Sequence, residues 1–577
     1  MGRNPSSADA LLLVLLCLLA HGRSMGGVFH YDDLHSIVDN EHIRSLALIP
    51  ALFTDPTTFS GLSFGAMFRP LVMLSYALTY AVFALEPGIY LATNFILHVG
   101  VVLVCLAILR HFIADRFLLL GAAALIGVHP VNVETVAYVS TRSESMCALF
   151  MLLGLWLFWK ETGPRWWYWL AVFCYACALM SKSVGITLLP MLAIHQIWFA
   201  TGSLKCRGLR LLPFFAVTIA YLTIVSDLLR TSLVQAPVRE MGAQLLTQSK
   251  ALIYYLHLLS VPWGLSVEHQ FEIGRSGDVV VWLSVLFLLS SLLLIIGAGL
   301  GQRSRWWLLW GLVVLAPTLI VPLNVLVNEH RLYMVSIGFA ALLGTLIVSA
   351  SLQIQRVSMV AIGLLVVLSF QRSAVWADTH ILWQDAVTKG PMMPRGHLFV
   401  GDSEAASGRY GQALGHYEQA LQVNPPLLSD ADRLIIHNNR GAALLALGAL
   451  GEARQAYLQV VGIDSTYQPA RDALAGLAAF DAEGDEEKAL VDRRRGLSAM
   501  VAGDIGAATH YLRQSLTVIS HGGTWLVLGS CHERLGQTEE AVDIYRMLSL
   551  GSSQAAITAT ERLARLGASD GIQSAGR

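Results

Sequence analysis

Long apolar runs without charged residues fill the first two thirds of the chain. A helix that crosses a bilayer needs about 20 mostly apolar residues, and residues 1–372 hold nearly all of the runs that approach this length. Charged residues make up 14% of the chain, whereas an average soluble protein carries roughly 25%. We therefore expect an all-α protein, with a polytopic membrane domain over residues 1–372 and a soluble helical domain over residues 373–577.

Most of the apolar runs are clear candidates for membrane spans, but three are ambiguous. Residues 10–20 read either as a cleaved signal peptide or as a first span, and residues 70–85 and 249–265 either cross the membrane or lie on its surface. The clear runs are residues 88–110, 117–130, 143–159, 166–180, 183–200, 209–227, 279–300, 306–325, 333–351 and 357–371.

Basic residues indicate which loops face the cytoplasm. If the amino terminus is cytoplasmic and neither 70–85 nor 249–265 spans, every cytoplasmic loop carries Lys or Arg, as the positive-inside rule requires. These residues are Arg110, Arg116, Lys160, Arg165, Lys205, Arg207, Arg210, Arg303, Arg305 and Arg356. If either stretch did span, some of these loops would face outward. We therefore expect both stretches to be helices on the outer face, about eleven spans, and a carboxy-terminal domain outside the cytoplasm.

The soluble part carries a repeated pattern of small and aromatic residues. Gly496 and Gly529 lie 33 residues apart, as do Ala508 and Ala541. Small residues let the two helices of a hairpin approach closely, and a period near 34 resembles the tetratricopeptide repeat. Such arrays bind peptide segments on their concave face. Four units are expected, with residues 466–487 as an irregular helical turn; the first two carry Gly401, Gly408, Ala413, Tyr417, Ala420, Pro425, Gly441, Gly448, Ala453 and Tyr457.

Ionisable residues gather in the loops that this topology places outside. Charged side chains at membrane depth are costly, so those that occur there usually have a function. The first outer loop, residues 28–69, begins with the acidic pair Asp32 and Asp33 and ends with Arg69. The other outer loops contribute His129, Glu134, Arg142, Lys182, Glu329, His330 and Arg331.

These residue types suit the transfer of a group from a lipid phosphate. A carboxylate such as Asp32 can act as general base on an acceptor hydroxyl. Cations can hold a phosphate and stabilise it as a leaving group; the candidates are Arg69, Arg142, Lys182, His330 and Arg331. The alternative is that each charge forms an interhelical ion pair or reaches out of the bilayer, and Asp33 could be a helix cap beside Asp32 as the base.

Composition and spacing argue against two other classes of site. The net charge of −1 makes a general attraction to nucleic acid unlikely to drive function. No metal-ligand spacing of the zinc type occurs. The binding of a loosely held divalent cation near Asp32 stays an open alternative.

The order of several motifs resembles the transmembrane and tetratricopeptide-repeat O-mannosyltransferase family, within the GT-C superfamily of membrane glycosyltransferases. The matching pieces are Tyr31-Asp32-Asp33, Phe68-Arg69-Pro70-Leu71, His129-Pro130 with Glu134, Ser181-Lys182, Asn328-Glu329-His330-Arg331-Leu332-Tyr333, and Trp376 with Leu382-Trp383. The resemblance implies a sugar donor on polyprenyl or dolichyl phosphate, Asp32 as base, Asp33 as second acid or orienter, inversion at the sugar, and an uncleaved first span. It also implies that His129, Glu134 and Glu329 support the site, that the repeats bind a protein acceptor, and that the sugar is mannose.

The chain departs from the family pattern at Ser183, at Asn132 and over Thr141-Arg142-Ser143-Glu144, which puts details of donor binding in doubt. The segment Asn328–Tyr333 looks most like bacterial members. We therefore expect a bacterial inner membrane with periplasmic repeats, with an endoplasmic reticulum membrane and lumenal repeats as the alternative. Two other functions stay open, namely a non-enzymatic membrane scaffold for envelope assembly and a flippase for a lipid-linked sugar.

Overall fold

The computed structural model describes residues 6–567 except 62–65, 161–162, 202, 232–237, 298, 348–351, 425–426, 482–483, 518 and 551–552. All regular elements of these residues are helices, without a strand, which confirms the predicted all-α class. The chain forms two compact units, Met1–Gly390 and Pro391–Arg577.

Every predicted apolar run coincides with a helix of the first unit, as far as the described residues extend. The ends of two runs, at 298 and 348–351, lie outside them. The helices are α1 (Ser7–His21), α4 (Pro87–Leu109), α5 (Arg116–Val128), α7 (Arg142–Trp159), α8 (Arg165–Ser181), α9 (Leu188–Trp198), α11 (Leu212–Ile224), α14 (Val279–Gly297), α15 (Gln302–Ile320), α16 (Tyr333–Ile347) and α17 (Leu352–Val375).

Six helical segments of the described residues are each long and apolar enough to cross a membrane, and a seventh is obtained if α5 and the bent segment Pro130–Ala137 form one span. The bend between these two is 43°. The remaining predicted spans fall on helices that are shorter or carry charges near one end, such as α7 and α15. The chain is thus a multi-pass membrane protein, and its span count is broadly compatible with the predicted eleven.

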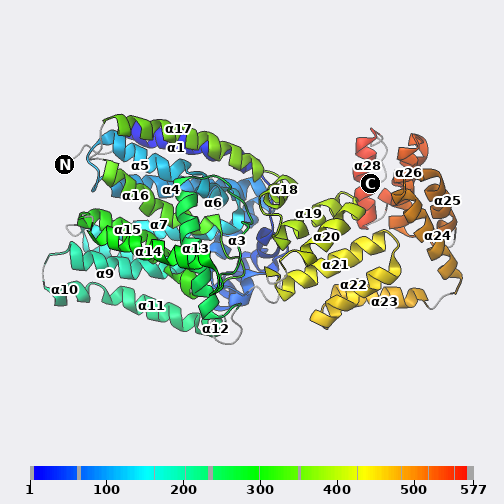
Figure 1. The fold of residues 1–577 in the computed structure, drawn as a ribbon, viewed down its shortest axis with the longest axis horizontal. Coiled ribbons are helices and arrows are strands. Elements are labelled where there is room, and N and C mark those ends of the chain that lie inside the picture. Colours follow the sequence, from blue (N-terminus) through cyan, green and yellow to red (C-terminus); the bar gives the residue numbers. More distant parts are fainter. Residues whose placement is uncertain are drawn as a thin grey trace. The chain divides into compact units, whose positions relative to one another are not determined.

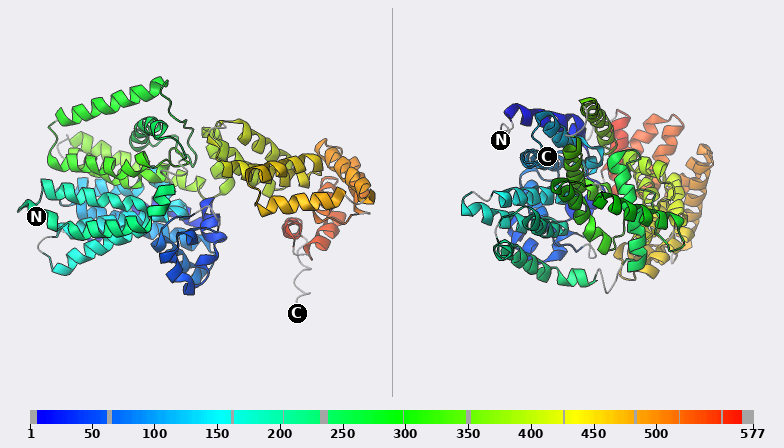
Figure 2. Two further views of the ribbon diagram at one scale, coloured as in Figure 1. Left: turned by 90° about the horizontal axis from the view of Figure 1, so that it is seen from below. Right: turned by 60° about the vertical axis from the view of Figure 1, so that its left-hand side comes forward.

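The two stretches expected on the outer face are also helical. Residues 70–85 form α3 (Pro70–Phe83), which packs against α4, α7 and α8. Residues 249–265 fall mainly on α13 (Met241–Ser260), which runs across the direction of the long helices in Figures 1 and 2. α14 packs mainly on α13 and stands apart from the other helices in Figure 2.

The loops sort to the two ends of this helix bundle. The start of α1 and α10 (Leu204–Leu209) lie at one end, with the loops that carry the predicted cytoplasmic cations (Figure 1). The first loop, α3, α6 (Val133–Ala137) and α18 (Thr379–Lys389) lie at the other end. The acidic pair and the exit of the chain toward the repeats therefore share one end of the first unit.

The second unit consists of helical hairpins, as predicted. The four predicted units are the pairs α19–α20, α21–α22, α24–α25 and α26–α27. A side chain at Gly401 would place its Cβ 2.6 Å from the Tyr417 ring, so only glycine allows this approach of α19 to α20. Gly408, with φ of +74°, provides the left-handed turn between them. The bounds are α19 (Pro394–Ala406), α20 (Tyr410–Gln422), α21 (Asp430–Ala446), α22 (Leu450–Ile463), α23 (Gln468–Asp481), α24 (Gly484–Val501), α25 (Ile505–Leu516), α26 (Gly522–Arg534), α27 (Thr538–Ser549) and α28 (Gln554–Arg565).

The region expected to be irregular, residues 466–487, instead contains the regular helix α23 and the start of α24. The apolar residues Ala470 and Leu477 of α23 are buried against α22, which explains a helix without a clear repeat motif. Pro425 of the first repeat lies outside the described residues.

Candidate active site

The candidate site is built around residues 129–145, which we call the central segment. It joins α5 to α7 through a 3-10 turn at Pro130–Asn132, α6, and a second 3-10 turn at Val139–Thr141. Its valines are fully buried, so the backbone is held in the interior of the bundle end. Its polar side chains therefore have fixed partners, and these partners come from distant loops.

Asp33 joins the first loop to the central segment. Its carboxylate is fully buried and accepts hydrogen bonds from the amide of His30 at 3.0 Å, and from the amide and hydroxyl of Ser140 at 2.7 and 2.5 Å. Burial raises the pKa of Asp33 to about 7, and the hydrogen bonds partly oppose that shift. A carboxylate so enclosed positions the loop and does not face an acceptor.

Asp32, in contrast, points toward solvent. Its side chain is 43% exposed, and its nearest ionic partner is His35 at 3.5 Å. Its backbone amide donates to the hydroxyl of Tyr138 at 3.0 Å, which holds the residue in place. The preceding Tyr31 has a φ of +40°, a left-handed conformation that costs about 1 kcal/mol or more for a residue with a side chain. The ring of Tyr31, the residue with this strained backbone, packs edge-to-face against the ring of Trp383.

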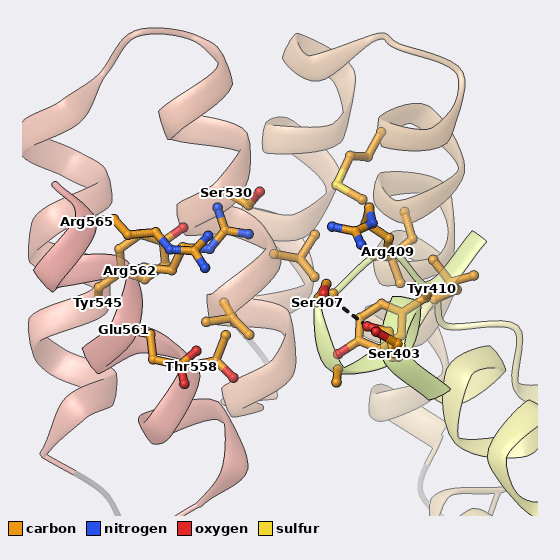
Figure 3. A pocket seen from close by; sticks show the side chains of 18 residues that line it. Ser403, Ser407, Arg409, Tyr410, Ser530, Tyr545, Thr558, Glu561, Arg562 and Arg565 are labelled. Atoms are coloured by element: carbon orange, nitrogen blue, oxygen red, sulfur yellow. Dashed lines mark hydrogen bonds between the residues drawn. The ribbon is translucent and has the colours of Figure 1, made fainter. Parts of the chain in front are cut away.

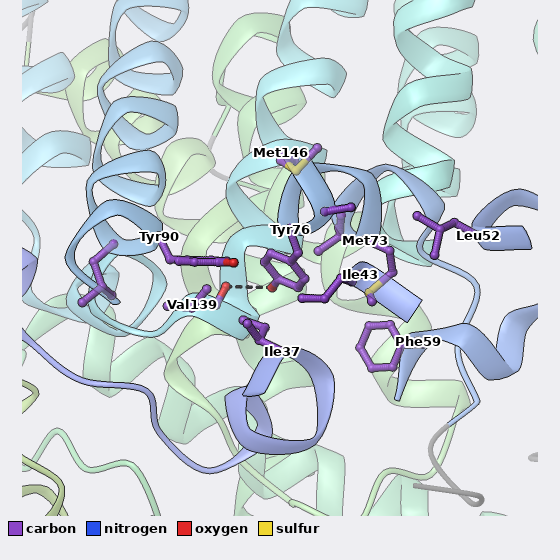
Figure 4. Close-up of a cluster of buried hydrophobic side chains, with 12 residues drawn as sticks. Ile37, Ile43, Leu52, Phe59, Met73, Tyr76, Tyr90, Val139 and Met146 are labelled. Carbon is purple, nitrogen blue, oxygen red and sulfur yellow. Dashed lines mark hydrogen bonds between the residues drawn. The ribbon is translucent and has the colours of Figure 1, made fainter. Parts of the chain in front are cut away.

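A hydrophobic cluster fixes the first loop against the helices beneath it. Ile37, Ile43 and Phe59 of the loop pack with Tyr76 of α3 and Tyr90 of α4 (Figure 4). The Tyr76 hydroxyl also donates to the backbone oxygen of Val139 at 3.0 Å, the bond drawn in Figure 4. The cluster thus ties the loop to the central segment through apolar contacts and the Tyr76 hydroxyl.

Arg142 lies beneath this cluster and is fully buried. Its guanidinium donates to the Asn94 side chain at 2.9 Å, the Ser75 hydroxyl at 3.0 Å and the Tyr90 carbonyl at 2.9 Å, and lies over the Tyr76 ring. All three of its nitrogens are engaged by α3 and α4. This geometry favours a role in positioning α7 over the direct phosphate contact that the sequence suggests for Arg142.

Arg69, Lys182, His330 and Arg331 are brought together. The charges of the other three are all close enough to act on the His330 ring. Each residue is also tethered: Arg69 to the Ser143 hydroxyl at 3.4 Å, Lys182 to Glu144, His330 to Glu134 at 2.8 Å, and Arg331 to the carbonyls of Val325 and Leu326. The first three tethers belong to the central segment, which therefore connects this group to the acidic pair. We call the group the cation cluster after Arg69, Lys182 and Arg331, the three cations that surround His330.

The other two predicted supporting residues brace neighbouring loops. Glu329 is fully buried and accepts from the Ser266 amide at 2.5 Å, with His269 at 3.3 Å. The His129 ring lies 3.0 Å from the backbone oxygen of Leu259 at the end of α13. His129 thus connects the site to the end of α13 and Glu329 connects it to the segment that follows α13, and neither belongs to the cation cluster.

The segment just before the repeats is part of the site. The His30 ring donates through Nε2 to the Trp376 carbonyl at 2.8 Å and accepts at Nδ1 from the Thr379 hydroxyl at 3.0 Å. Burial lowers the pKa of His30, which favours the neutral ring that this pattern needs. Trp376 stacks on Tyr138, and Arg372 pairs with Asp385 of α18 at 2.8 Å.

Sequence reasoning missed several residues that the structure places at the site. Glu144 occurs in a quoted motif, and its pairing with Lys182 could have been inferred from opposite charge on one side of the membrane. Tyr138 and Ser140 carry no such signal, because a tyrosine or serine in an apolar run is common. Among the described residues no group of three or more His, Cys, Asp or Glu side chains is arranged to hold a metal ion; the divalent cation near Asp32 stays a prediction.

Comparison with known proteins gives two independent matches. A tetratricopeptide-repeat family model matches residues 401–467, which run from the middle of α19 to just past the end of α22. The human protein O-mannosyl-transferase TMTC3 is 22% identical over 82% of this chain, and its Drosophila melanogaster counterpart is 23% identical over 80%. The mouse protein O-mannosyl-transferase TMTC4 is 31% identical over 32% of the chain.

The matches to TMTC3 extend through both units, so they carry the order of membrane helices and repeats as well as single motifs. The chain spans just over half of these two relatives, namely 57% of the human and 59% of the Drosophila protein. It spans 29% of mouse TMTC4. Over most of its length the chain is therefore similar to the transmembrane and tetratricopeptide-repeat O-mannosyltransferases, the family that its motifs predict.

Proposed function

We propose that this protein is a membrane glycosyltransferase, which moves a sugar from a polyprenyl or dolichyl phosphate to a hydroxyl group of a protein. The observation that carries the proposal is that a half-exposed carboxylate, Asp32, and the cation cluster are both held by contacts with the central segment. The names of the relatives support a transfer of mannose to protein hydroxyls.

Asp32 is the candidate catalytic base. Its carboxylate takes the proton from the acceptor hydroxyl while that oxygen attacks the anomeric carbon of the sugar. The bond between this carbon and the phosphate oxygen breaks, and its electrons go to the phosphate, so the sugar configuration is inverted. Asp33 acts as a positioning residue, because its carboxylate is occupied by Ser140 and the His30 amide.

The cation cluster is the candidate site for the phosphate. Guanidinium and ammonium groups stabilise the charge that the leaving phosphate gains. The tethers of Arg69, Lys182 and His330 hold these groups in place before the donor arrives, so little reorganisation is needed. The lipid tail of the donor would lie in the bilayer, with the repeats binding the protein acceptor on the same side.

The membrane that houses the reaction follows from the resemblance of residues Asn328–Tyr333 to bacterial members. We propose a bacterial inner membrane with periplasmic repeats. The alternative is an endoplasmic reticulum membrane with lumenal repeats.

The test uses the full chain in lipid nanodiscs, with radiolabelled polyprenyl-phosphate mannose and a pool of peptides that contain Ser and Thr. We expect labelled peptide with the wild-type chain. Asp32→Asn should lower the transfer rate by a factor of about 100 or more, the usual contribution of a general base, and should still bind the donor. The matched control is Asp39→Asn, which removes an exposed carboxylate from the same loop.

The alternatives give different results. A scaffold would give no labelled peptide with any variant, and its function would depend on the repeats and not on Asp32. A flippase would move the lipid-linked sugar across a sealed bilayer without forming a new glycosidic bond. Equal transfer by Asp32→Asn and the wild type would overturn the proposed base.

A further inference from the structure

Two adjoining cavities of the repeat unit are lined by four arginines. The first, of about 590 Å³, lies between the turn that joins α19 to α20 and the helices α24, α26 and α28 (Figure 3). We call it the basic pocket; its ionisable lining residues are Arg409, Glu561, Arg562 and Arg565. Hydroxyl groups complete its polar lining, from Ser403, Ser407, Tyr410, Ser530, Tyr545 and Thr558.

The arginines of the basic pocket differ in how far they are already paired. Arg409 forms an ion pair with Glu404, and Arg562 pairs with Glu533 at 3.0 Å. Arg565 is exposed, and within the part of the chain that the structure describes it forms neither a hydrogen bond nor an ion pair. Its charge is therefore available to a bound partner.

The second cavity, of about 530 Å³, continues the first and shares Tyr410, Ala446, Leu526 and Val527 with it. Its lining is mostly apolar, and we call it the apolar groove. It contains Arg493, which is only 7% exposed and whose Nε has no hydrogen-bond partner among the described residues. A buried, unsatisfied donor of a charged group costs free energy, so a ligand acceptor at this point would be stabilising.

The charge of these cavities is opposite to that of their surroundings. Acidic residues outnumber basic ones in residues 391–577, yet the lining of both cavities is positive. An extended chain with carboxylates and aliphatic side chains would match this combination, whereas a free phosphate or other small anion would leave the apolar groove empty. We propose that the basic pocket and the apolar groove together bind an acidic peptide segment of a partner protein, whose carboxylates pair with Arg565 and Arg493.

This binding goes beyond the proposed sugar transfer and requires none of its steps. The test measures fluorescence anisotropy of labelled peptides with the full chain in nanodiscs. One peptide alternates Asp and Leu, and its matched partner alternates Asn and Leu. We expect the acidic peptide to bind about tenfold more tightly or better, because hydrogen bonds to charged groups are the stronger ones, and its affinity to fall with added salt.

Two variants of equal charge change locate the site. Arg565→Glu should weaken binding of the acidic peptide by about tenfold or more. Arg546→Glu, on the exposed face of α27 and outside both cavities, should leave it unchanged. Equal affinity for the two peptides, or equal affinity of the two variants, would overturn the proposal. Asp32→Asn should bind the peptide like the wild type, which separates failure of this site from failure of the transferase reaction.

Discussion

The carboxylate of Asp33 accepts hydrogen bonds from both the amide and the hydroxyl of Ser140, a residue 107 positions further along the chain. Through Ser140 the first loop is joined to the segment that also holds Ser143, Glu144 and Glu134, and thereby Arg69, Lys182 and His330. The candidate base and the candidate phosphate site are thus fixed relative to each other by one short stretch of backbone.

The raised pKa of Asp33 predicts that stability depends on pH. The pKa is about 7 in the folded protein and near 3.8 when Asp33 is exposed by unfolding. Between these values the folded state binds more protons, so Asp33 adds stability at low pH that is lost as the pH rises toward 7. We expect the melting temperature of the wild type to fall from pH 5 to pH 7.5 relative to Asp33→Asn. Parallel curves for the two proteins would contradict the assignment.

Arg142 is predicted to stabilise the fold and to leave donor binding to its neighbours. Arg142→Gln removes hydrogen bonds to three groups in the interior and should cost about 3 kcal/mol or more. The control Arg275→Gln removes an exposed cation from the loop before α14, and should change the melting temperature little. Thermal unfolding in nanodiscs measures both. At a temperature where it is folded, Arg142→Gln should keep its donor affinity; a loss would restore the phosphate role that the sequence suggests.

Arg69 is predicted to contribute to donor affinity. Arg69→Gln should weaken binding of polyprenyl-phosphate sugar by about tenfold, since one charge-assisted contact to the phosphate is removed. In the fold Arg69 makes one long hydrogen bond, to the hydroxyl of Ser143 at 3.4 Å, so its loss should leave the protein folded. Lys205→Gln removes an exposed cation from the other end of the bundle and serves as control. Binding of a fluorescent donor is the measurement, and indistinguishable affinities of the two variants would remove Arg69 from the phosphate site.

Cys206 provides a test of sidedness. Among the described residues it is the one exposed cysteine, and it lies in α10 at the end of the bundle opposite to Asp32. A membrane-impermeant maleimide should leave Cys206 unlabelled in intact spheroplasts and label it after permeabilisation. A cysteine at Ser407, in the first repeat, should react in both cases. Labelling of both residues from the same side would place the repeats with the basic loops and contradict the proposed topology.

The local features of this protein could be predicted from sequence because they depend on residues close together in the chain. The apolar runs predict helices that coincide with those of the structure, and the repeated small residues predict helical hairpins. In the structure the Tyr417 ring lies against Gly401 in the first of these hairpins. The acidic pair and the cations are also readable as candidates, because charged residues beside membrane spans are rare and costly.

The burial and the partners of these candidates were decided by tertiary structure. The resemblance favours Asp32 over Asp33 as the base without a physical reason; in the structure the Asp32 carboxylate is half exposed and the Asp33 carboxylate is enclosed by Ser140. Likewise Arg142 and Arg69 look equivalent until packing places one beneath the Tyr76 ring and the other in the cation cluster. Burial and partners are set by segments a hundred or more residues away, and no local pattern records which of them will meet.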